Sequence, residues 1–451
     1  MPSRQYLTIF KMAWPIILAN ASVPILGLVD TAVIGQTGTA VHLGAIALAA
    51  LIFSFVYWGF GFLRMGTTGF IAQAKGAKNT NELHALVFRT LFLGCFIGLC
   101  LIALQWPIES LATSWLNASD DVLDLVRVYF YTRIWGAPAT LMLFSLFGIF
   151  IGMGWSTYLL YTQLVLNGIN IILNITFVIG LHMGVKGIAL GTLVAEWLAC
   201  AFALLILLPK MRLYRPLKRF SELLELILDS ERLKALFSVN ANIMVRTLVL
   251  IAGFAWFANQ GASYGDATLA ANHILLQFIS LSAFFLDGYA NVAETLVGQA
   301  YGAKNTQRFS QAVRDSTTLA ALTALFLALI FYFFGHDFIS LLTQDRQVQA
   351  IARNFNTMAS IYIFVSFAAF QLDGIFIGVT QTRPMRNATI LAFIVFILLS
   401  WALGASWKNH GLWFAFIFYV VFRAIGLAVY YPSLIRHMQQ IHAHYKKSSN
   451  A

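Results

Sequence analysis

The chain has 451 residues, of which 59% are hydrophobic and only 10% are charged, and its formal net charge is +11. Typical soluble domains carry about a quarter charged residues, so this composition excludes a soluble globular protein and indicates an integral membrane protein. The basic charge does not indicate a nucleic-acid partner, because lysine and arginine are grouped in short segments between long apolar runs.

Apolar runs of about 20 residues, the length that crosses a bilayer, recur along the whole chain. We predict an all-α integral membrane protein with twelve transmembrane helices, at residues 9–34, 43–72, 85–106, 122–150, 158–180, 187–208, 236–258, 268–299, 312–334, 350–378, 388–405 and 411–435. No large soluble domain fits between these runs. The first run is too long for a cleavable signal peptide, so we expect none.

Segments that contain lysine and arginine alternate with segments that are poor in them. The basic segments follow the second, sixth, eighth, tenth and twelfth runs. Basic loops of membrane proteins stay in the cytoplasm. We therefore expect a multi-pass protein of the cell inner membrane, with both termini cytoplasmic, and we expect a monomer.

Two short sequences each occur twice. QAKGAKNT at 73–80 returns as QAYGAKNT at 299–306, and GIFIG at 148–152 returns at 374–378, so both pairs are 226 residues apart. The halves are therefore homologous, and because each holds six spans the repeats are parallel and pseudo-symmetric. The predicted organisation is listed in chain order: an N-lobe at 1–208, a cytoplasmic inter-lobe linker at 209–235, a C-lobe at 236–435 and a cytoplasmic tail at 436–451.

An acid, Asp30, lies inside the first span, roughly 12 Å below its outer end at 1.5 Å per residue. Asn170 and Asn174 share one face of the fifth span, and Thr192 lies at similar depth in the sixth. This oxygen-rich set can hold a hard cation or supply hydrogen-bond partners to a protonatable carboxyl. Tyr129 in the fourth span is a candidate donor to Asp30. An intramembrane acid is a functional candidate by default.

The structural alternative for Asp30 is an ion pair with Arg133 in the fourth span.

The repeat gives a second line of reasoning about where coupling resides. The positions 226 residues after the four polar residues are occupied by Trp256, Phe396, Ser400 and Phe418. The C-lobe thus lacks the acid and most of its polar partners, and coupling is expected to reside in the N-lobe.

The C-lobe has buried charges of its own: Arg246, Asp287, Glu294, Asp373 and Arg423. Asp287 and Arg423 both fall near mid-membrane, and we expect them to pair with each other.

In the first span, Pro15 and Pro24 each remove a helix hydrogen bond. They produce either static curvature or a hinge.

Three stretches carry a family resemblance: WPIILANASVPILGLVDTAVIG in the first span, TTGFIAQAKGAKN after the second and VGQAYGAKN after the eighth. Together they resemble the multidrug and toxic compound extrusion (MATE) transporters. LVDTAVIG, FLRMGTTG, GLHMGVKGIALGT and LDGYANVAE resemble the DinF-like branch. The resemblance implies twelve helices in two lobes and the export of organic compounds driven by inward flow of H⁺ or Na⁺.

The resemblance also implies roles for single residues. It makes Asp30 the coupling acid and supports Pro15 as the hinge. It also makes Asp373 a secondary cation-binding candidate, with a structural ion pair as the favoured alternative, and Asp287 is a further secondary candidate of our own. The family pattern has an acid where Asn174 stands here, so one carboxylate remains to neutralise a cation. We therefore favour H⁺ coupling through Asp30 and bending of the first span, with Na⁺ coupling as the alternative.

Two rival functions remain open. A lipid or lipid-linked precursor flippase would need cationic residues in its cavity, for which Arg64 and Arg133 are candidates. A membrane-embedded enzyme would need a catalytic pair at one depth, which the N-lobe spans lack. Cys95, Cys100 and Cys200 have no metal-ligand spacing, and no phosphate-binding loop occurs. We expect no metal, no cofactor and no enzymatic activity; the expected partners are small organic substrates and membrane lipid.

Overall fold

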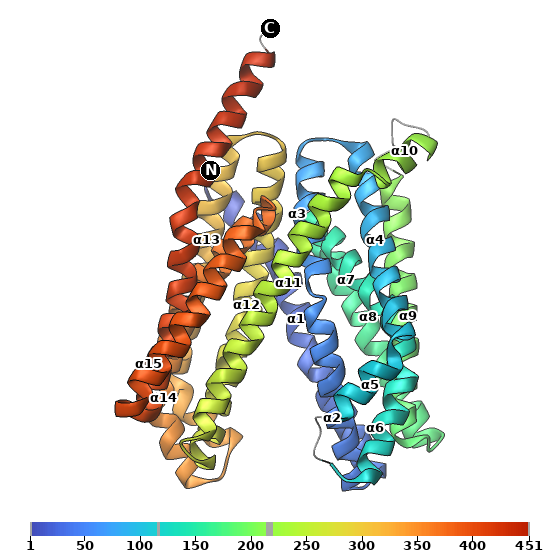
Figure 1. Ribbon diagram of the computed structural model, residues 1–451, viewed down its shortest axis with the longest axis vertical. Coiled ribbons are helices and arrows are strands. Elements are labelled where there is room, and N and C mark those ends of the chain that lie inside the picture. Colours follow the sequence, from blue (N-terminus) through green and yellow to red (C-terminus); the bar gives the residue numbers. More distant parts are fainter. Residues whose placement is uncertain (1, 115–117, 213–219, 450–451) are drawn as a thin grey trace. The chain divides into compact units, whose positions relative to one another are not determined.

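The computed structural model describes residues 2–114, 118–212 and 220–449, and these residues form helices without any strand. The all-α prediction is confirmed. The helices in chain order (Figure 1) are α1 Pro2–Thr37, α2 Ala40–Gly59, α3 Phe62–Gly76, α4 Thr80–Ala103, α5 Gln105–Ser114, α6 Asp120–Arg133, the 3₁₀ turn η1 Ile134–Gly136, α7 Ala137–Gly152, α8 Ser156–Asn174, the π-helical segment η2 Ile175–Gly180, α9 Gly184–Met211, α10 Phe220–Ile227, α11 Ser230–Ala262, α12 Asp266–Gly302, α13 Thr306–Leu342, α14 Arg346–Gly378 and α15 Thr382–Ser449.

In the described residues, eleven helical segments are long and apolar enough to cross a membrane. The last, Thr382–Gln440, has 59 residues, and a single crossing needs about 20. Its backbone leaves the helical region at Lys408, with φ 46° and ψ −126°. This residue lies between the eleventh and twelfth predicted spans, so the segment accounts for both.

The internal repeat is visible in the backbone. Of the eight described residues with positive φ, six form pairs 226 residues apart: Lys78 (55°) with Lys304 (53°), Gly154 (69°) with Thr380 (58°), and His182 (55°) with Lys408 (46°). L-residues seldom adopt this region, so the pairing reflects homologous turns rather than chance. The predicted two-fold pseudo-symmetry thus extends to the turns between spans.

The repeated GIFIG sequence has a packing reason. A side chain on Gly148 would collide with the backbone of Arg64, and one on Gly374 would collide with that of Ala290, the residue 226 positions after Arg64. Both glycines therefore let two helix backbones touch. The same short motif is used at the same place in each half.

By their contacts, the residues form two compact units, and each is described by itself. One contains residues 18–71 and 79–234, and the other contains 1–17, 72–78 and 235–451. Most residues follow the predicted lobes, but the first part of α1 packs with the second unit. The reason is close packing on α12, since a side chain on Gly288 would meet Ile17 and the backbone of Ala13.

In the first unit α4 packs on α7, and α9 packs on α8 and α6 (Figure 1). The predicted linker is largely helical, with residues 213–219 outside the described part. Arg89 is a buried residue of α4. It donates to Glu82 at 2.8 Å and to the carbonyl oxygens of Leu226 and Ile227, and so fixes the end of α10.

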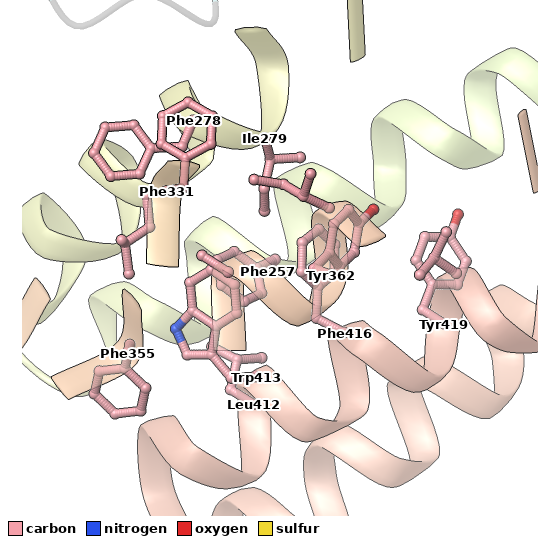
Figure 2. Close-up of a cluster of buried hydrophobic side chains, with 14 of the residues drawn as sticks. Phe257, Phe278, Ile279, Phe331, Phe355, Tyr362, Leu412, Trp413, Phe416 and Tyr419 are labelled. Carbon is pink, nitrogen blue, oxygen red and sulfur yellow. The ribbon is translucent and has the colours of Figure 1, made fainter. Parts of the chain in front are cut away.

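In the second unit α12, α13, α14 and α15 pack side by side (Figure 1). Figure 2 shows its aromatic core: the ring of Phe416 stacks on Phe257 and Tyr362, with centroids 4.4 and 4.6 Å apart. Trp413 is fully buried, and its indole N–H donates to Oδ1 of Asn272 at 2.9 Å. The polar group of this large side chain is thereby satisfied.

Candidate ion-coupling site

The polar site of the first unit is built by α8, which carries a stripe of amides on one face. Gln163, Asn167, Asn170 and Asn174 follow one another at spacings of three or four residues and are all buried. Residues at these spacings lie on the same side of a helix. The stripe meets α1 at two places, so α8 holds part of α1 by hydrogen bonds.

The contact near the C-terminal end of α8 contains all four residues that the sequence placed at one depth. Asn174 Nδ2 donates to Asp30 Oδ1 at 2.6 Å and to Asn170 Oδ1 at 2.7 Å. Asn170 Nδ2 donates to Thr192 Oγ1 at 2.9 Å, and the Thr192 hydroxyl donates to the carbonyl oxygen of Ile188 at 3.0 Å. The structure thus joins α1, α8 and α9 in one hydrogen-bond chain.

The chain ends on a carboxylate that is only half-buried, whereas Asn170 and Asn174 are fully buried. Both N–H groups of Asn174 are in use, so the amide cannot rotate without losing a partner. A hydrogen bond to an ionised carboxylate is about twice as strong as a neutral one. The site therefore holds Asp30 most firmly to α8 when its carboxyl is ionised.

One acceptor at this site has no partner. Asn174 Oδ1 is buried without a hydrogen bond, and it lies where a side chain on Gly191 of α9 would be. The glycine makes room for the amide. Directly after Asn174 the helix widens into the π-helical segment Ile175–Gly180, a distortion that is frequent at functional sites.

The second contact between α8 and α1, in the middle of α8, involves Ser22. Asn167 Nδ2 donates to Ser22 Oγ at 2.8 Å and to its carbonyl oxygen at 3.3 Å, while Gln163 Nε2 donates to Asn167 Oδ1 at 2.9 Å. The sequence analysis did not single out these residues, although the spacing of the amides along the fifth span was a readable signal. They fix the middle of α1 two turns away from Asp30.

Arg133 is not the partner of Asp30 and belongs to a separate buried cluster. Its guanidinium donates to Glu196 at 3.2 Å and to the hydroxyl of Tyr129 at 3.1 Å, and it lies 4.7 Å from the centre of the Phe53 ring. The hydroxyl of Tyr129, a candidate donor to Asp30, accepts from Arg133. The cluster gives Glu196, for which the sequence offered no role, an ion-pair partner.

Pro15 and Pro24 both lie inside α1, which is one helix from Pro2 to Thr37. Pro15 is buried and Pro24 is exposed. The boundary between the two compact units falls between residues 17 and 18, within one turn of Pro15. The candidate hinge thus lies where α1 changes its packing partners.

Three of the buried charges of the second unit form a triad in which Asp373 accepts from two arginines. Arg423 donates at 2.8 Å, and Arg246 donates to the same oxygen, Oδ2. Arg423 therefore has Asp373 as its partner, where the sequence favoured Asp287. Asp287 itself accepts from the side chain of Asn291 at 3.0 Å. With two arginines on its carboxylate, Asp373 is poorly suited to bind a further cation.

In the described residues no group of three or more His, Cys, Asp or Glu side chains has the geometry to hold a metal ion. The oxygen atoms around Asp30 belong mostly to neutral amide and hydroxyl groups. Such an arrangement of one carboxyl among amide and hydroxyl groups has the chemistry to accept a proton or a monovalent cation.

A repeated six-span bundle with an intramembrane acid in a polar chain is typical of membrane transporters. The sequence pattern of the MatE family matches residues 15–176 and 243–402. DNA damage-inducible protein F of Escherichia coli is 34% identical over 423 residues, which is 93% of this chain and 90% of that protein. The chain belongs to the MatE family of multidrug efflux transporters, and it is therefore a transporter rather than an enzyme.

More distant similarity also extends over most of the chain. The probable multidrug resistance protein NorM of Pasteurella multocida is 24% identical over 389 residues, covering 85% of this chain and 83% of that protein. The Vibrio cholerae MATE transporter VcmN in its bent form superimposes with a TM-score of 0.87 at 20% identity, covering 98% of this chain and 99% of that one. The resemblance read from the sequence motifs is confirmed.

Proposed function

We propose that this protein exports lipophilic, often cationic organic compounds across the bacterial inner membrane in exchange for inward-moving H⁺, and that Asp30 carries the proton. The observation that supports this proposal most directly is the hydrogen-bond chain from Thr192 through Asn170 and Asn174 to Asp30. Its Asn174 amide donates to a single carboxylate, and that carboxylate is exposed enough to exchange protons.

The chemistry of the oxygens favours H⁺ over Na⁺. A hard metal cation takes several oxygen ligands at once. Here Asn170 Oδ1 and Thr192 Oγ1 already accept hydrogen bonds, and the second carboxylate of the family pattern is replaced by Asn174. The Asp30 carboxylate and the unpaired Oδ1 of Asn174 are too few ligands for a metal cation. A proton needs only the Asp30 carboxyl.

Proton binding would loosen α1 from α8. A neutral carboxyl accepts a weaker hydrogen bond from Asn174 than a carboxylate does. The part of α1 from residue 18 onward packs with one unit and the part before it with the other. Pro15 has no N–H to give up, so bending near it costs no additional helix hydrogen bond. The proposed cycle therefore couples protonation of Asp30 to bending of α1 at Pro15.

The test is drug transport in proteoliposomes that contain the purified full chain. We expect an imposed pH gradient to drive transport of a fluorescent organic cation, and an imposed Na⁺ gradient to have no effect. Asp30→Asn should remain folded and lose gradient-driven transport. Asp266→Asn, at the first turn of α12, is the matched control and should transport normally. The proposed coupling would be refuted if Asp30→Asn transported at the normal rate, or if a Na⁺ gradient alone drove transport by the unchanged protein.

The flippase alternative finds less support. It relied on Arg64 and Arg133 as cavity cations, but Arg133 is paired with Glu196 and packed against Phe53. Its charge is neutralised inside the first unit and is not available to a lipid phosphate.

A further inference from the structure

A basic cavity of about 490 Å³ lies in the second unit, at the end of α3, the end of α12 and the beginning of α13. Its polar lining consists of three cationic and three carboxamide side chains: Lys75, Lys78, Arg308, Gln5, Gln299 and Gln311. The other lining residues are Gly76, Leu296 and three alanines, so no acidic side chain faces the cavity. The proposed transport cycle makes no use of this site.

The cavity is built by the two copies of the repeated QA-x-GAKNT motif. A side chain on Gly76 would collide with the carbonyl group of Gln299, and a side chain on Gly302 would collide with that of Gln73. The two helix ends thus meet backbone to backbone in a reciprocal way. Gln73 Nε2 also donates to the carbonyl oxygen of Gly378 at 2.9 Å. The walls of the cavity are therefore fixed by the fold.

The repeat shows that the positive charge does not follow from the fold alone. Residue 301, the counterpart of Lys75, is tyrosine, and residue 82, the counterpart of Arg308, is glutamate. Residue 231, the counterpart of Gln5, is also glutamate. The lining positions thus hold three cations and no acid, whereas their counterparts hold one lysine and two acids. Such a difference between equivalent positions indicates a ligand with negative charge.

We propose that this cavity binds a phosphate group, supplied by the headgroup of an anionic phospholipid. Arginine and lysine are the side chains that best recognise phosphate oxygens. The site lies at the ends of helices that are long and apolar enough to span a membrane, and the ends of such helices are where lipid headgroups are expected. The proposed topology, on which this inference rests, puts the site on the cytoplasmic side of the membrane. Basic pockets between membrane helices on that side bind anionic lipid headgroups. Leu296 and the alanines offer an apolar wall to the glycerol and first acyl carbons.

The test measures ligand binding to the purified full chain, so its outcome does not depend on transport. Native mass spectrometry and thermal unfolding are followed while phosphatidylglycerol, phosphatidylcholine or inorganic phosphate is added. We expect phosphatidylglycerol to bind about tenfold or more tightly than phosphatidylcholine. The combined variant Lys75→Gln, Lys78→Gln and Arg308→Gln should lose this preference.

Single variants guard against misfolding, because the side chains of Lys78 and Arg308 are exposed. Lys78→Gln should weaken phosphatidylglycerol binding, and Lys304→Gln, its counterpart with the same left-handed backbone, should not. Binding of inorganic phosphate that depends on the three cations, without a lipid preference, would support the phosphate site and assign its ligand to the soluble pool. Binding of both ligands that is unchanged in the combined variant would overturn the proposal.

Discussion

Trp256 donates a hydrogen bond from its indole nitrogen to Ser400 Oγ across 2.9 Å, and these two residues stand 226 positions after Asp30 and Asn174. The same contact between equivalent helices thus exists in both halves, but only the first copy contains an acid. Phe396, the counterpart of Asn170, packs instead on Tyr419, with ring centroids 5.1 Å apart. The fold supplies the geometry twice, and the side chains make only the first copy able to bind a proton.

This asymmetry gives a first prediction, for Asn174→Asp. The substitution restores a second carboxylate beside Asp30 and leaves the oxygen of residue 174 in place. Because two carboxylates neutralise a metal cation better than one, we expect a Na⁺ gradient to begin to drive drug transport in proteoliposomes. Asn167→Asp adds the same charge to the same face of α8, but at Ser22, and should not create Na⁺ dependence. If drug transport by Asn174→Asp is still driven by the pH gradient alone, residue 174 does not decide which ion the protein couples to transport.

A second prediction concerns Gly191. A methyl group at this position would occupy the space of Asn174 Oδ1, so Gly191→Ala should displace the amide from Asp30. Overpacking of this kind costs about 1–3 kcal/mol. We expect a lower unfolding midpoint and a loss of proton-driven transport of at least about tenfold. Gly168→Ala, on α8 with open space around its Cα, is the control. Full transport by Gly191→Ala would mean that the Asn174–Asp30 bond is dispensable.

Counting residues from the span ends located the four members of the polar chain. It succeeded because α8 begins within two residues of its predicted start, and because Asn170 and Asn174 are one turn apart on a regular helix. The same method did not find the Arg133–Glu196 pair. Arg133 ends α6 and Glu196 lies on α9, and hydropathy does not tell which residues of two neighbouring helices face each other.

Depth alone also gave the wrong partner to Arg423. Asp287 of α12 was placed at the depth of Arg423, yet Arg423 donates to Asp373 of α14, because depth does not tell which residues of neighbouring helices face each other. The division of α1 between two units was likewise not readable, because it depends on the fit of Gly288 against Ile17. Sequence reasoning thus recovered elements and depth, while the pairing of side chains across helices required the structure.

A third prediction follows from the Asp373 triad. Asp373→Asn would leave Arg246 and Arg423 buried beside each other without a counter-charge, and breaking a buried pair costs about 3–5 kcal/mol. We expect a large drop in the thermal unfolding midpoint of the purified protein. Arg423→Gln should cost less, because Asp373 keeps Arg246 as its partner. Transport per folded molecule should stay proton-driven in both variants. A stable Asp373→Asn protein that has lost its coupling to H⁺ would instead assign the acid a direct role.

The last prediction separates a hinge at Pro15 from static curvature. Proline inside a helix is about 3 kcal/mol less favourable than alanine, so both Pro15→Ala and Pro24→Ala should stabilise α1. If α1 bends where its packing partners change, between residues 17 and 18, stiffening at Pro15 should slow drug export by about fivefold or more. Pro24 lies wholly within the part of α1 held by α8, so Pro24→Ala should export normally. Thermal unfolding and efflux are measured on the same samples, and a stabilised Pro15→Ala protein with full efflux would show that the proline only shapes the helix.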